Sequence, residues 1–557
     1  MDDYLRKREE LMLKDRALRY DHATDREPSA DEVVADKVLR NIRTAEAESV
    51  WDPNRKTEQP HGSQQMFPGM EFLTARATIM STQLFAILSK VRSLRDHFFE
   101  LELDASQMPK GGLLHAHLDA TVRADVLLEL AMKQPAIHVR APGKLSAGNF
   151  KTVLPEFRAL PQAQWTQIPS ITDPSYEPNT WVPIKNARGN FSDALGGPAG
   201  FDRWVVGALM IEPAEAYGTH NSTAKIWKKF QSTFGVSDGL IRFVPVWTEY
   251  VREFLLSSIE DGISYVEPRI LFWFKHMIGA DGKENVPHRV WLQMYERVLN
   301  EVKASLDVRG RADEFVGSKI IYSTLRIGTP EELEWYTEDC LALKVEFPHL
   351  IAGFDIVGHE DSLEPLIKYA DVFLRFKERQ KELGVDIPFV FHAGETLGDG
   401  TAADVNLYDA ILLGTKRIGH GLSIYKHPHL MEICREKGIC IEMCPISNEI
   451  LRLTGSMPMH PLPAIMNHGV HVALCSDDPA VFGNMGLTFD FFQVFVASEV
   501  NGLITLRELV WDSIRFSNLD EEEKGRALSL LEKRWAQFVR HVLEEYGGSD
   551  AGGRLET

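Results

Sequence analysis

The chain lacks the features that mark a disulfide-stabilised or membrane-spanning protein. It has five cysteines among 557 residues, none of them before Cys340, and no Cys-x-x-Cys pair. An odd number at this density does not form a disulfide framework, and without such a pair a zinc–cysteine cluster is not expected. We interpret the cysteines of the predicted strands as small buried apolar residues. No apolar run is long enough to cross a bilayer.

Positive charge is also in deficit. The chain has 61 lysines and arginines against 80 aspartates and glutamates, a formal net charge of −19 at pH 7. Such a field repels nucleic acid and anionic membrane surfaces, so we expect neither as a partner. Residues 1–8 are charged and lack the apolar segment of a secretory signal. The sequence thus predicts a cytoplasmic protein and leaves secretion by an unconventional route open.

What the chain does contain is an eightfold alternation of short apolar runs with stretches of helical periodicity. The short runs favour buried parallel strands. Helical stretches separate most of them, for example 330–347, 363–383, 402–413 and 431–437. This order predicts an α/β fold, a (β/α)8 TIM barrel. The eight strand candidates are 108–119, 262–270, 317–326, 350–358, 387–396, 417–421, 440–446 and 470–478.

Segments outside this alternation define the rest of the organisation. One long amphipathic helix is expected from residue 70 to about 103, and its apolar face would either dock on the barrel or pair with a second chain. Helices are also expected at 505–517, opening with a capping box of Thr505 and Glu508, and at 521–545. The predicted domains are an N-terminal helical, partly disordered extension (1–103), the first barrel strand and helix (104–136), an insertion lobe after that strand (137–238), the rest of the barrel with C-terminal helices (239–546) and a mobile tail (547–557).

Polar side chains collect at the ends of four of the predicted strands. In a barrel the active site is built at the C-terminal strand ends, so these side chains are expected to meet at one rim. Side chains two residues apart on a strand point the same way, which places the first two histidines on one face. Packing alone does not gather four histidines and three carboxylates there. The set is His115 and His117, His392 and Glu395, His420, and Asp477 with Asp478.

This set has the composition of a zinc site with its proton-transfer groups. Three neutral imidazoles and one carboxylate suit one Zn²⁺ per chain, with a position left for water. Zinc lowers the pKa of bound water from about 15.7 to about 7. His420 can help to form and to steer the nucleophile, and Glu395 can give a proton to the leaving group or to a ring nitrogen. The residues predict hydrolysis at an electron-poor carbon and leave open whether that carbon carries an amine, an ester or an amide.

The motifs around these residues resemble those of the adenosine deaminase family within the metal-dependent amidohydrolases, from about residue 72 to 545. Three further stretches, 108–111, 353–361 and 444–448, are similar to the adenosine deaminase-related growth factor branch. That branch carries an N-terminal helical dimerisation segment and an insertion after the first strand. The family motifs are His115-Ala116-His117-Leu118-Asp119, His392-Ala393-Gly394-Glu395, His420-Gly421 and Ser476-Asp477-Asp478-Pro479.

The resemblance implies roles for the metal-binding and catalytic residues. Glu395 would protonate the purine ring N1, and His420 would orient the attacking hydroxide. Asp478 would hydrogen-bond ring N7 and help to position the hydroxide. The zinc ligands implied by the resemblance are His115, His117, His392 and Asp477.

The resemblance also implies substrate contacts, with two departures from the branch. Gly358 would contact ring N3 through its backbone, Asp119 would hold a ribose hydroxyl and Trp227 would pack on the sugar. Residues 1–339 contain no cysteine, whereas secreted members staple the insertion with a disulfide. Leu325 stands where a histidine is expected in secreted members. These departures put secretion, extracellular signalling and the mode of sugar recognition in question.

The leading functional prediction is zinc-dependent hydrolytic deamination of adenosine or 2′-deoxyadenosine to inosine or 2′-deoxyinosine and ammonia, by a homodimer. One alternative is a deaminase of another aminopurine, namely adenine, AMP or an N6-substituted adenosine. Another is a growth-factor-like interaction protein with secondary enzyme activity, which the complete set of ligands and proton-transfer groups disfavours. A binuclear site is disfavoured because 350–358 offers no bridging lysine, and a cytidine-deaminase site because its Pro-Cys-x-x-Cys motif is missing.

Overall fold

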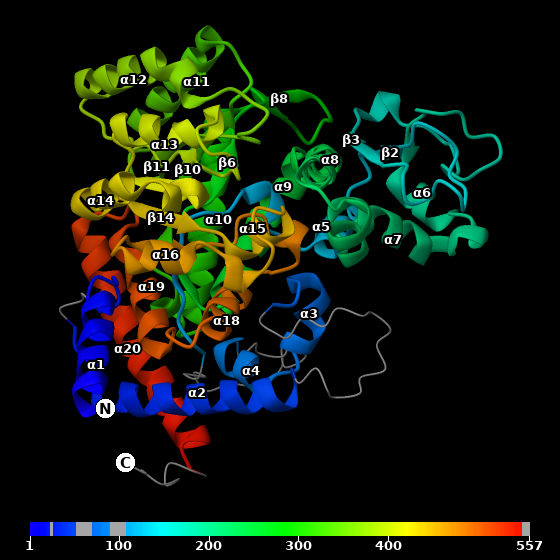
Figure 1. Cartoon of the computed structure of the whole chain (residues 1–557). Helices are drawn as coiled ribbons and strands as arrows, with labels where there is room; N and C mark the ends of the chain where they lie inside the picture. Colours follow the sequence, from blue (N-terminus) through cyan, green and yellow to red (C-terminus); the bar gives the residue numbers. More distant parts are fainter. Residues whose placement is uncertain (23–25, 52–68, 90–106, 549–557) are drawn as a thin grey trace.

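The computed structural model describes residues 1–22, 26–51, 69–89 and 107–548 (Figure 1). At its centre, parallel strand segments form a barrel with helices outside it. Neighbouring strands pair in parallel register, and the eight positions are occupied by short segments. In order around the barrel they are β1 (Gly111–Leu113), β5 (Ile263–Val266) with β6 (Arg269–Leu271), β9 (Gly317–Ser318) with β10 (Ile320–Leu325), β11 (Ile351–Val357), β12 (His392–Ala393), β13 (Arg417–His420), β14 (Cys440–Met443) and β15 (Val472–Leu474).

The barrel closes between its first and eighth positions. The His117 N–H donates to the Asp477 carbonyl at 3.0 Å, and the Asp477 N–H donates to the His115 carbonyl at 3.1 Å. These bonds continue the β1 and β15 strands beyond their regular ladders. Barrel closure therefore fixes the backbone of three residues that the sequence places in the candidate site, and the predicted (β/α)8 architecture is confirmed.

The fifth strand is less regular than the sequence predicts. Only His392 and Ala393 form a ladder with β13, and Phe389 makes a single bridge to Phe354 of β11. Pro388 has no N–H to donate, and its carbonyl accepts from the Phe354 N–H at 3.0 Å. The expectation of a continuous strand over 387–391 was wrong for this reason, although the segment keeps its place in the barrel.

Helices cover the outside of the barrel, and those predicted at 330–347 and 402–413 are confirmed to within a residue. The helix predicted at 363–383 begins only at Ala370, after a 3-10 turn over Leu366–Tyr369. The helices are α5 (Ala124–Met132), α9 (Val244–Glu260), α10 (His288–Val308), α11 (Pro330–Glu346), α12 (Ala370–Leu383), α13 (Ala402–Leu412), α14 (Pro428–Lys437), α16 (Leu462–Asn467), α18 (Thr488–Val496), α19 (Leu503–Arg515) and α20 (Glu521–Tyr546).

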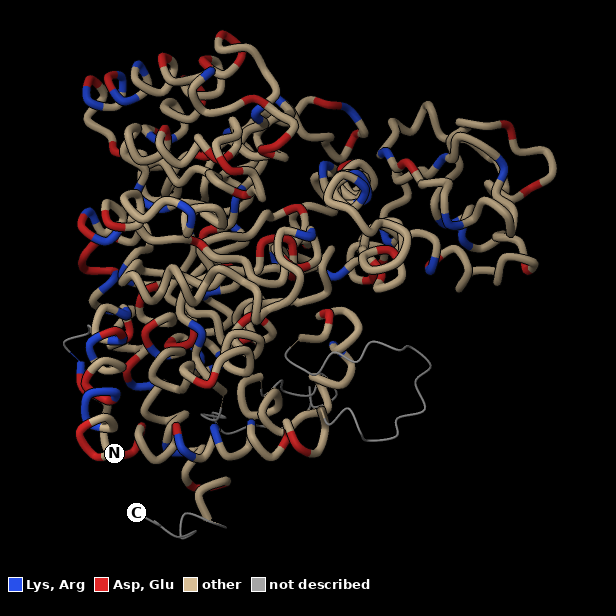
Figure 2. The backbone as a smooth tube through the Cα atoms, viewed as in Figure 1, with Lys and Arg blue, Asp and Glu red and all other residues tan. Residues whose placement is uncertain are grey.

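Charges of both signs are interleaved on the outer helices (Figure 2). Between α11 and α12, Arg375 pairs with Glu334 at 3.0 Å and Arg379 with Glu338 at 3.3 Å. Such exposed pairs contribute about 0 to 1 kcal/mol each. The acidic excess is therefore carried over a surface that contains local ion pairs, and the stability of the barrel rests on its core.

The N-terminal segment packs against the C-terminal helices. Helix α2 (Ala30–Ser49) starts with a capping box between Ser29 and Glu32, and α1 (Asp2–Arg16) precedes it with no buried residue. The Glu32 carboxylate also accepts from Arg507 of α19 at 3.1 Å and from the Trp535 indole N–H of α20 at 2.9 Å. One buried carboxylate thus begins α2 and joins it to two helices distant in sequence.

The single long helix predicted from residue 70 is wrong. The structure has α3 (Phe72–Ile79) and α4 (Gln83–Ser89), bent by 86° at the break, and residues 90–103 lie outside the described part. The Thr82 hydroxyl accepts from the Phe85 N–H at 3.2 Å and so starts a new helix. Among the described residues no single helix has the length and hydropathy of a membrane span. The bent pair passes that test together, and its apolar side chains, such as Leu84 and Leu88, are buried in the protein core.

Helix α19 also begins earlier than predicted. Its first residue is Leu503, and the Gly502 N–H donates to Thr505 Oγ1 at 3.2 Å, so Thr505 lies inside the first turn. The Leu503 N–H is capped by Asp36 of α2 at 2.6 Å. The cap is supplied by a residue 467 positions away in the sequence. A local capping pattern cannot predict such a distant partner. The predicted mobile tail lies outside the described residues from 549 onward.

The segment after α5 forms a small lobe beside the barrel (Figure 1). Strand β2 pairs antiparallel with both β3 and β4. Helix α8 closes the segment and packs on β3. A Cβ at Gly239 would lie 1.8 Å from the carbonyl oxygen of Phe157, so only glycine allows this contact. The elements are β2 (Ile137–Arg140), β3 (Glu156–Ala159), β4 (Val182–Pro183), α6 (Ile184–Gly189), α7 (Gly197–Leu209) and α8 (Thr223–Ile241), and a hairpin of β7 (His276–Ile278) and β8 (Glu284–Pro287) follows later in the chain.

Candidate metal and catalytic site

Two site residues adopt backbone conformations that are uncommon for side chains other than glycine. His420 has φ 58° and Asp477 has φ 60°, both at the ends of barrel strands. Such conformations cost of order 1–3 kcal/mol and persist where the surrounding structure imposes them. Barrel closure imposes this one on Asp477, because its N–H and carbonyl are both bonded to the first strand. The turn aims both side chains into the mouth of the barrel.

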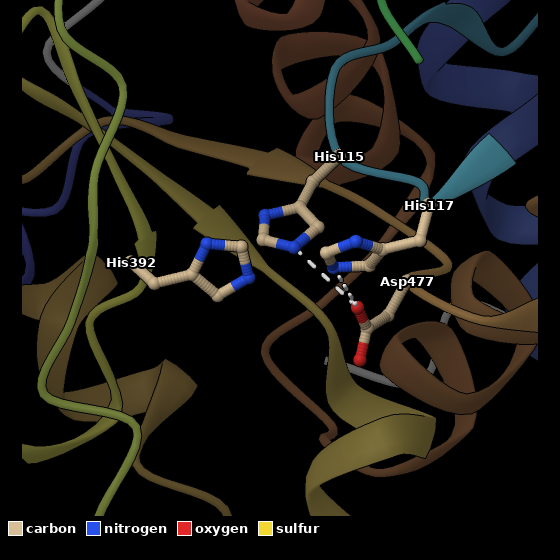
Figure 3. A group of neighbouring side chains, drawn as sticks. All are labelled: His115, His117, His392 and Asp477. Carbon is tan, nitrogen blue, oxygen red and sulfur yellow. Dashed lines mark ion pairs between the residues drawn. The ribbon is translucent and has the colours of Figure 1, made fainter. Parts of the chain in front are cut away.

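Four side chains converge there (Figure 3). One nitrogen or oxygen from each of His115, His117, His392 and Asp477 lies within 4.8 Å of the others. Asp477 Oδ1 is 3.4 Å from His115 Nε2 and 3.3 Å from His117 Nε2. The structure therefore brings together all four residues that the sequence named as ligands.

Buried carboxylates orient two of the imidazoles. His115 Nδ1 lies 2.8 Å from Glu442, and His392 Nδ1 lies 2.7 Å from Asp355. With Nδ1–H donated to a carboxylate, each ring turns the lone pair of Nε2 toward the cluster. Burial lowers the pKa of His392 to about 3, so this imidazole is neutral, as a ligand must be.

A buried ion-pair network holds those two carboxylates. Arg269 lies between them, with Nε 2.8 Å from Asp355 and Nη2 2.7 Å from Glu442. Arg417 bonds Glu442 on its other side at 2.5 Å. Burial alone would raise the pKa of Asp355, but His392 and Arg269 hold it well below its usual value. The cluster therefore rests on carboxylates that remain ionised in the core.

The donor set fits a divalent transition metal such as zinc. His115 Nε2 is buried and has no hydrogen-bond partner in the described structure, as a metal-facing nitrogen would be in the protein alone. A second group exchanges His117 and His392 for His420 and Cys444 within the same distance limit. Burial raises the pKa of the Cys444 thiol well above its usual value, so it stays protonated and is the poorer ligand. The first group is the better site.

Two carboxyl groups beside this cluster differ from its ligands. Burial, with Asp477 and Glu360 nearby, raises the pKa of Glu395 well above its usual value. Burial and then Asp477 do the same for Asp478. Glu395 Oε1 and Asp478 Oδ1 are buried and find no partner in the described structure. Their surroundings therefore favour the protonated form of both groups, and each has a buried oxygen that makes no hydrogen bond in the described structure.

His420 lies between the ligands and the acids. Its Nδ1 is 3.5 Å from Glu395 Oε1, and its Nε2 is 3.9 Å from Asp477 Oδ2. Burial lowers its pKa well below the usual value, so the ring is neutral. The residue lies beside the cluster, and its role in steering a bound group stays a prediction.

The predicted substrate contacts lie near the same rim. Gly358 follows β11 with φ +120°, and a Cβ there would meet Leu363 Cδ1 at 2.6 Å, so glycine is required. Asp119 lies two residues after His117, and burial raises its pKa. Trp227 is buried and stacks on His359, with 4.1 Å between the ring centroids. Trp227 thus lies against the loop that contains Gly358, and its contact with a sugar remains a prediction.

The residues that support the ligands lie outside the motifs that predicted the site. Ser447 donates to Asp477 Oδ2 at 2.7 Å, and Glu442, Asp355 and Arg269 form the network beneath the cluster. Their signal was a charged residue in the middle of an otherwise apolar strand, as in Ile441-Glu442-Met443. Charges at such positions are rarely tolerated without partners.

Comparison with known proteins shows the family of the chain. The adenosine deaminase family model matches residues 210–534. Adenosine deaminase 2 of Sus scrofa is 31% identical over 85% of this chain and 84% of its own, and adenosine deaminase of Phlebotomus duboscqi is 31% identical over 84% and 83%. The adenine deaminase of Arthrobacter aurescens shares the fold, with a TM-score of 0.50 and 18% identity over 77% of this chain and 99% of its own. The chain belongs to the adenosine deaminase family and is a deaminase.

Proposed function

We propose that the enzyme hydrolyses adenosine and 2′-deoxyadenosine to the inosine product and ammonia, with one Zn²⁺ held by His115, His117, His392 and Asp477. The observation that carries this proposal is the convergence of these four donors, within 4.8 Å, beside carboxyl groups held in the protonated form. When bound, the metal ion supplies a nucleophile at neutral pH by lowering the pKa of water.

The chain's own residues supply what a purine ring needs. The ring nitrogens N1, N3 and N7 of adenine are hydrogen-bond acceptors, so a binding site must offer donors. Protonated Glu395 is suited to donate to N1, which draws electrons from the neighbouring carbon and prepares it for attack. Protonated Asp478 is suited to donate to N7, and the Gly358 backbone N–H to N3. Neutral His420 steers the attacking oxygen.

The surroundings of Asp119 favour a nucleoside over a nucleotide. A cavity of about 20 Å³, room for about one water molecule, lies beside this carboxylate. Its lining is mostly apolar, includes Tyr250 and Phe234, and contains no lysine or arginine. Asp238 of α8 adds a second carboxyl group, whose pKa burial and Asp119 raise to about 7. A sugar hydroxyl suits these carboxyl groups, whereas a 5′-phosphate would find no cationic partner in this lining.

A deamination assay across adenosine, 2′-deoxyadenosine, adenine, AMP and N6-methyladenosine tests the proposal. We expect the two nucleosides to have the highest kcat/KM, and AMP the lowest among the adenosine derivatives. The same panel run on Asp119→Asn separates sugar recognition from ring chemistry, because only substrates with a ribose should respond. A preference for adenine or AMP would contradict the assignment.

We further propose that the enzyme is a homodimer that uses α1. This helix has no buried residue, and Tyr4, Leu5, Leu11 and Leu13 are each more than half exposed. Deleting residues 1–16 leaves α2 and its contacts with α20 in place. Sedimentation should show a monomer after the deletion and a dimer before it. An unchanged dimer would place the interface elsewhere.

A further inference from the structure

A chain of hydrogen bonds leads from a backbone amide to His420. It starts at the Leu462 N–H, which donates to His460 Nδ1 at 3.0 Å. His460 Nε2 lies 3.1 Å from Asn448 Oδ1, and Asn448 Nδ2 lies 3.2 Å from His420 Nδ1. The three side chains are buried, with exposed fractions of 3%, 0% and 1%. Neither His460 nor Asn448 belongs to the two groups of described residues that could hold a metal ion.

The Leu462 N–H fixes which atom donates and which accepts in each of these hydrogen bonds. A backbone N–H can only donate, so His460 Nδ1 is an acceptor. Burial lowers the pKa of His460 to about 3, so the ring is neutral and its one proton is on Nε2. That N–H requires an oxygen on Asn448, which leaves the amide NH₂ of Asn448 facing His420. His420 Nδ1 must then accept, and the proton of this neutral ring is on Nε2.

We propose that His460 and Asn448 are positioning residues that fix the tautomer of His420 with its proton on Nε2. The other end of the His420 ring agrees with this assignment. Its Nε2 faces Asp477 Oδ2 at 3.9 Å, where an N–H is favourable and a lone pair would be repelled. Helix α15 (Pro445–Ile450), which carries Asn448, also carries Ser447, the hydrogen-bond donor to Asp477. One short helix therefore orients both His420 and the carboxylate it faces.

This assignment has two consequences for the reaction proposed above, on which they rest. His420 acts through an N–H on the Asp477 side, so it steers the attacking oxygen as a donor and cannot take a proton at that atom. The sequence expectation, in which His420 both forms and steers the nucleophile, is narrowed to steering. At the other edge, the lone pair on Nδ1 faces Glu395 Oε1 at 3.5 Å. An ionised Glu395 would be repelled by this lone pair, which already accepts from Asn448, so the contact favours the uncharged, protonated Glu395 that can donate to N1 of the purine.

We call the hydrogen bonds from Leu462 through His460 and Asn448 to His420 the relay. Three variants test it in the zinc-loaded enzyme. Asn448→Asp is nearly isosteric and offers only acceptors, so it draws the proton of His420 to Nδ1. His460→Leu removes both ring nitrogens and frees the Asn448 amide to rotate. His460→Gln keeps an N–H at the position of Nε2 and should preserve the relay. The readouts are the ¹⁵N spectrum of histidine-labelled protein, with the His420 signals assigned through His420→Gln, and the steady-state kinetics.

We expect wild type and His460→Gln to show a protonated Nε2 and an unprotonated Nδ1 on His420. Asn448→Asp should invert the pattern and lower kcat by about 10- to 100-fold with KM nearly unchanged, and His460→Leu should show both tautomers. A wild-type enzyme with the proton on Nδ1, or an Asn448→Asp variant with wild-type spectrum and rate, would overturn the proposal. The spectrum does not depend on the substrate, so a wild-type enzyme with the expected tautomer and no activity on adenosine would refute the proposed function and leave the relay standing.

Discussion

Asp477 and Asp478 are neighbours in sequence and belong to opposite halves of the site. Burial would raise both pKa values, but His420, His115 and His117 surround Asp477 and hold its pKa well below the usual value. Asp478 has no such partners, and burial beside the charge of Asp477 raises its pKa. One carboxylate is therefore ionised among the ligands while the next is a proton donor. The surroundings of each carboxyl group, and not its residue type, therefore decide whether it is ionised or protonated.

The same contrast separates the two halves as a whole. On the ligand half, His115 and His392 each bond a carboxylate that is itself bonded to Arg269. On the acid half, Glu395 and Asp478 have buried oxygens without a hydrogen-bond partner in the described structure. The first half is completed by a metal ion, because His115 Nε2 has no hydrogen-bond partner in the described structure, and the second by a molecule that accepts hydrogen bonds.

Removing a ligand should break the first half outright. We expect His392→Ala to lose both bound zinc and several orders of magnitude in activity, because three donors remain and Asp355 keeps only Arg269 of its two side-chain partners. Metal analysis and the deamination assay on the same preparation measure this. His429→Ala is the control, since that side chain is 81% exposed on α14 and should change neither. Near-normal turnover in His392→Ala would end the four-ligand account.

Removing the proton from the second half should leave the first intact. Glu395→Gln keeps the shape of the side chain but has no acidic proton, so kcat should fall by about 10²- to 10⁴-fold while zinc content is unchanged. Steady-state kinetics with metal analysis separates the two effects. Glu378→Gln, an exposed change on α12, serves as the control. A Glu395→Gln enzyme as fast as wild type would assign the acid to another residue.

Loosening the support of a ligand should have an intermediate effect. Glu442→Gln removes the charge that faces His115, Arg269 and Arg417. We expect zinc affinity to fall by about 10- to 100-fold and the free energy of unfolding by about 3–5 kcal/mol. Glu267→Gln is the matched control, because Glu267 pairs with Arg417 at 2.6 Å and contacts no ligand in the described structure. Equal zinc affinity in the two variants would contradict the supporting role of Glu442.

The smallest effect is expected far from the site, at the junction of α2 with α19 and α20. Arg507 and the Ser29 backbone lower the pKa of Glu32 from its usual value of 4.5 against the opposing effect of burial. A lowered folded-state pKa means that the stabilisation is present above pH 4.5 and is lost as the pH falls through the folded value. Glu32→Gln should therefore cost about 1–2 kcal/mol of unfolding free energy at pH 7.

Denaturant unfolding at several pH values checks this, and kcat at pH 7 should be unchanged. The difference between Glu32→Gln and wild type should shrink below pH 4.5. A difference that grows in acid would contradict the assignment. Glu32→Gln thus disturbs a buried carboxylate that joins α2 to α19 and α20, away from the candidate site.

The sequence predicted the barrel because strands and helices alternate in a pattern that local periodicity reveals. It predicted the convergence of His115, His117, His392 and Asp477 because parallel barrel strands end at one rim. The sequence predictions were wrong where a helix end depends on a residue distant in sequence, and where a helix breaks within an apolar pattern. The break at Thr82 divides a continuous apolar pattern.

The supporting residues were hidden for a related reason. The supporting role of Asp355 and Glu442 depends on Arg269, which the barrel places between them. Arg269 is 86 residues from Asp355 and 173 from Glu442 in the sequence. His460 lies 12 residues from Asn448 in an irregular segment, and no periodicity connects the two. Residues that hold catalytic groups in place act through contacts, and contacts are what a single sequence does not display.

A zinc titration of chelator-treated enzyme, followed by metal content and adenosine deamination in the same samples, tests whether activity depends on one zinc ion held by these four residues. We predict that activity rises in proportion to bound zinc and saturates at one ion per chain, and that Asp477→Asn shows neither binding nor recovery. Full activity in metal-free protein, or saturation at two ions per chain with Asp477→Asn still active, would contradict the account.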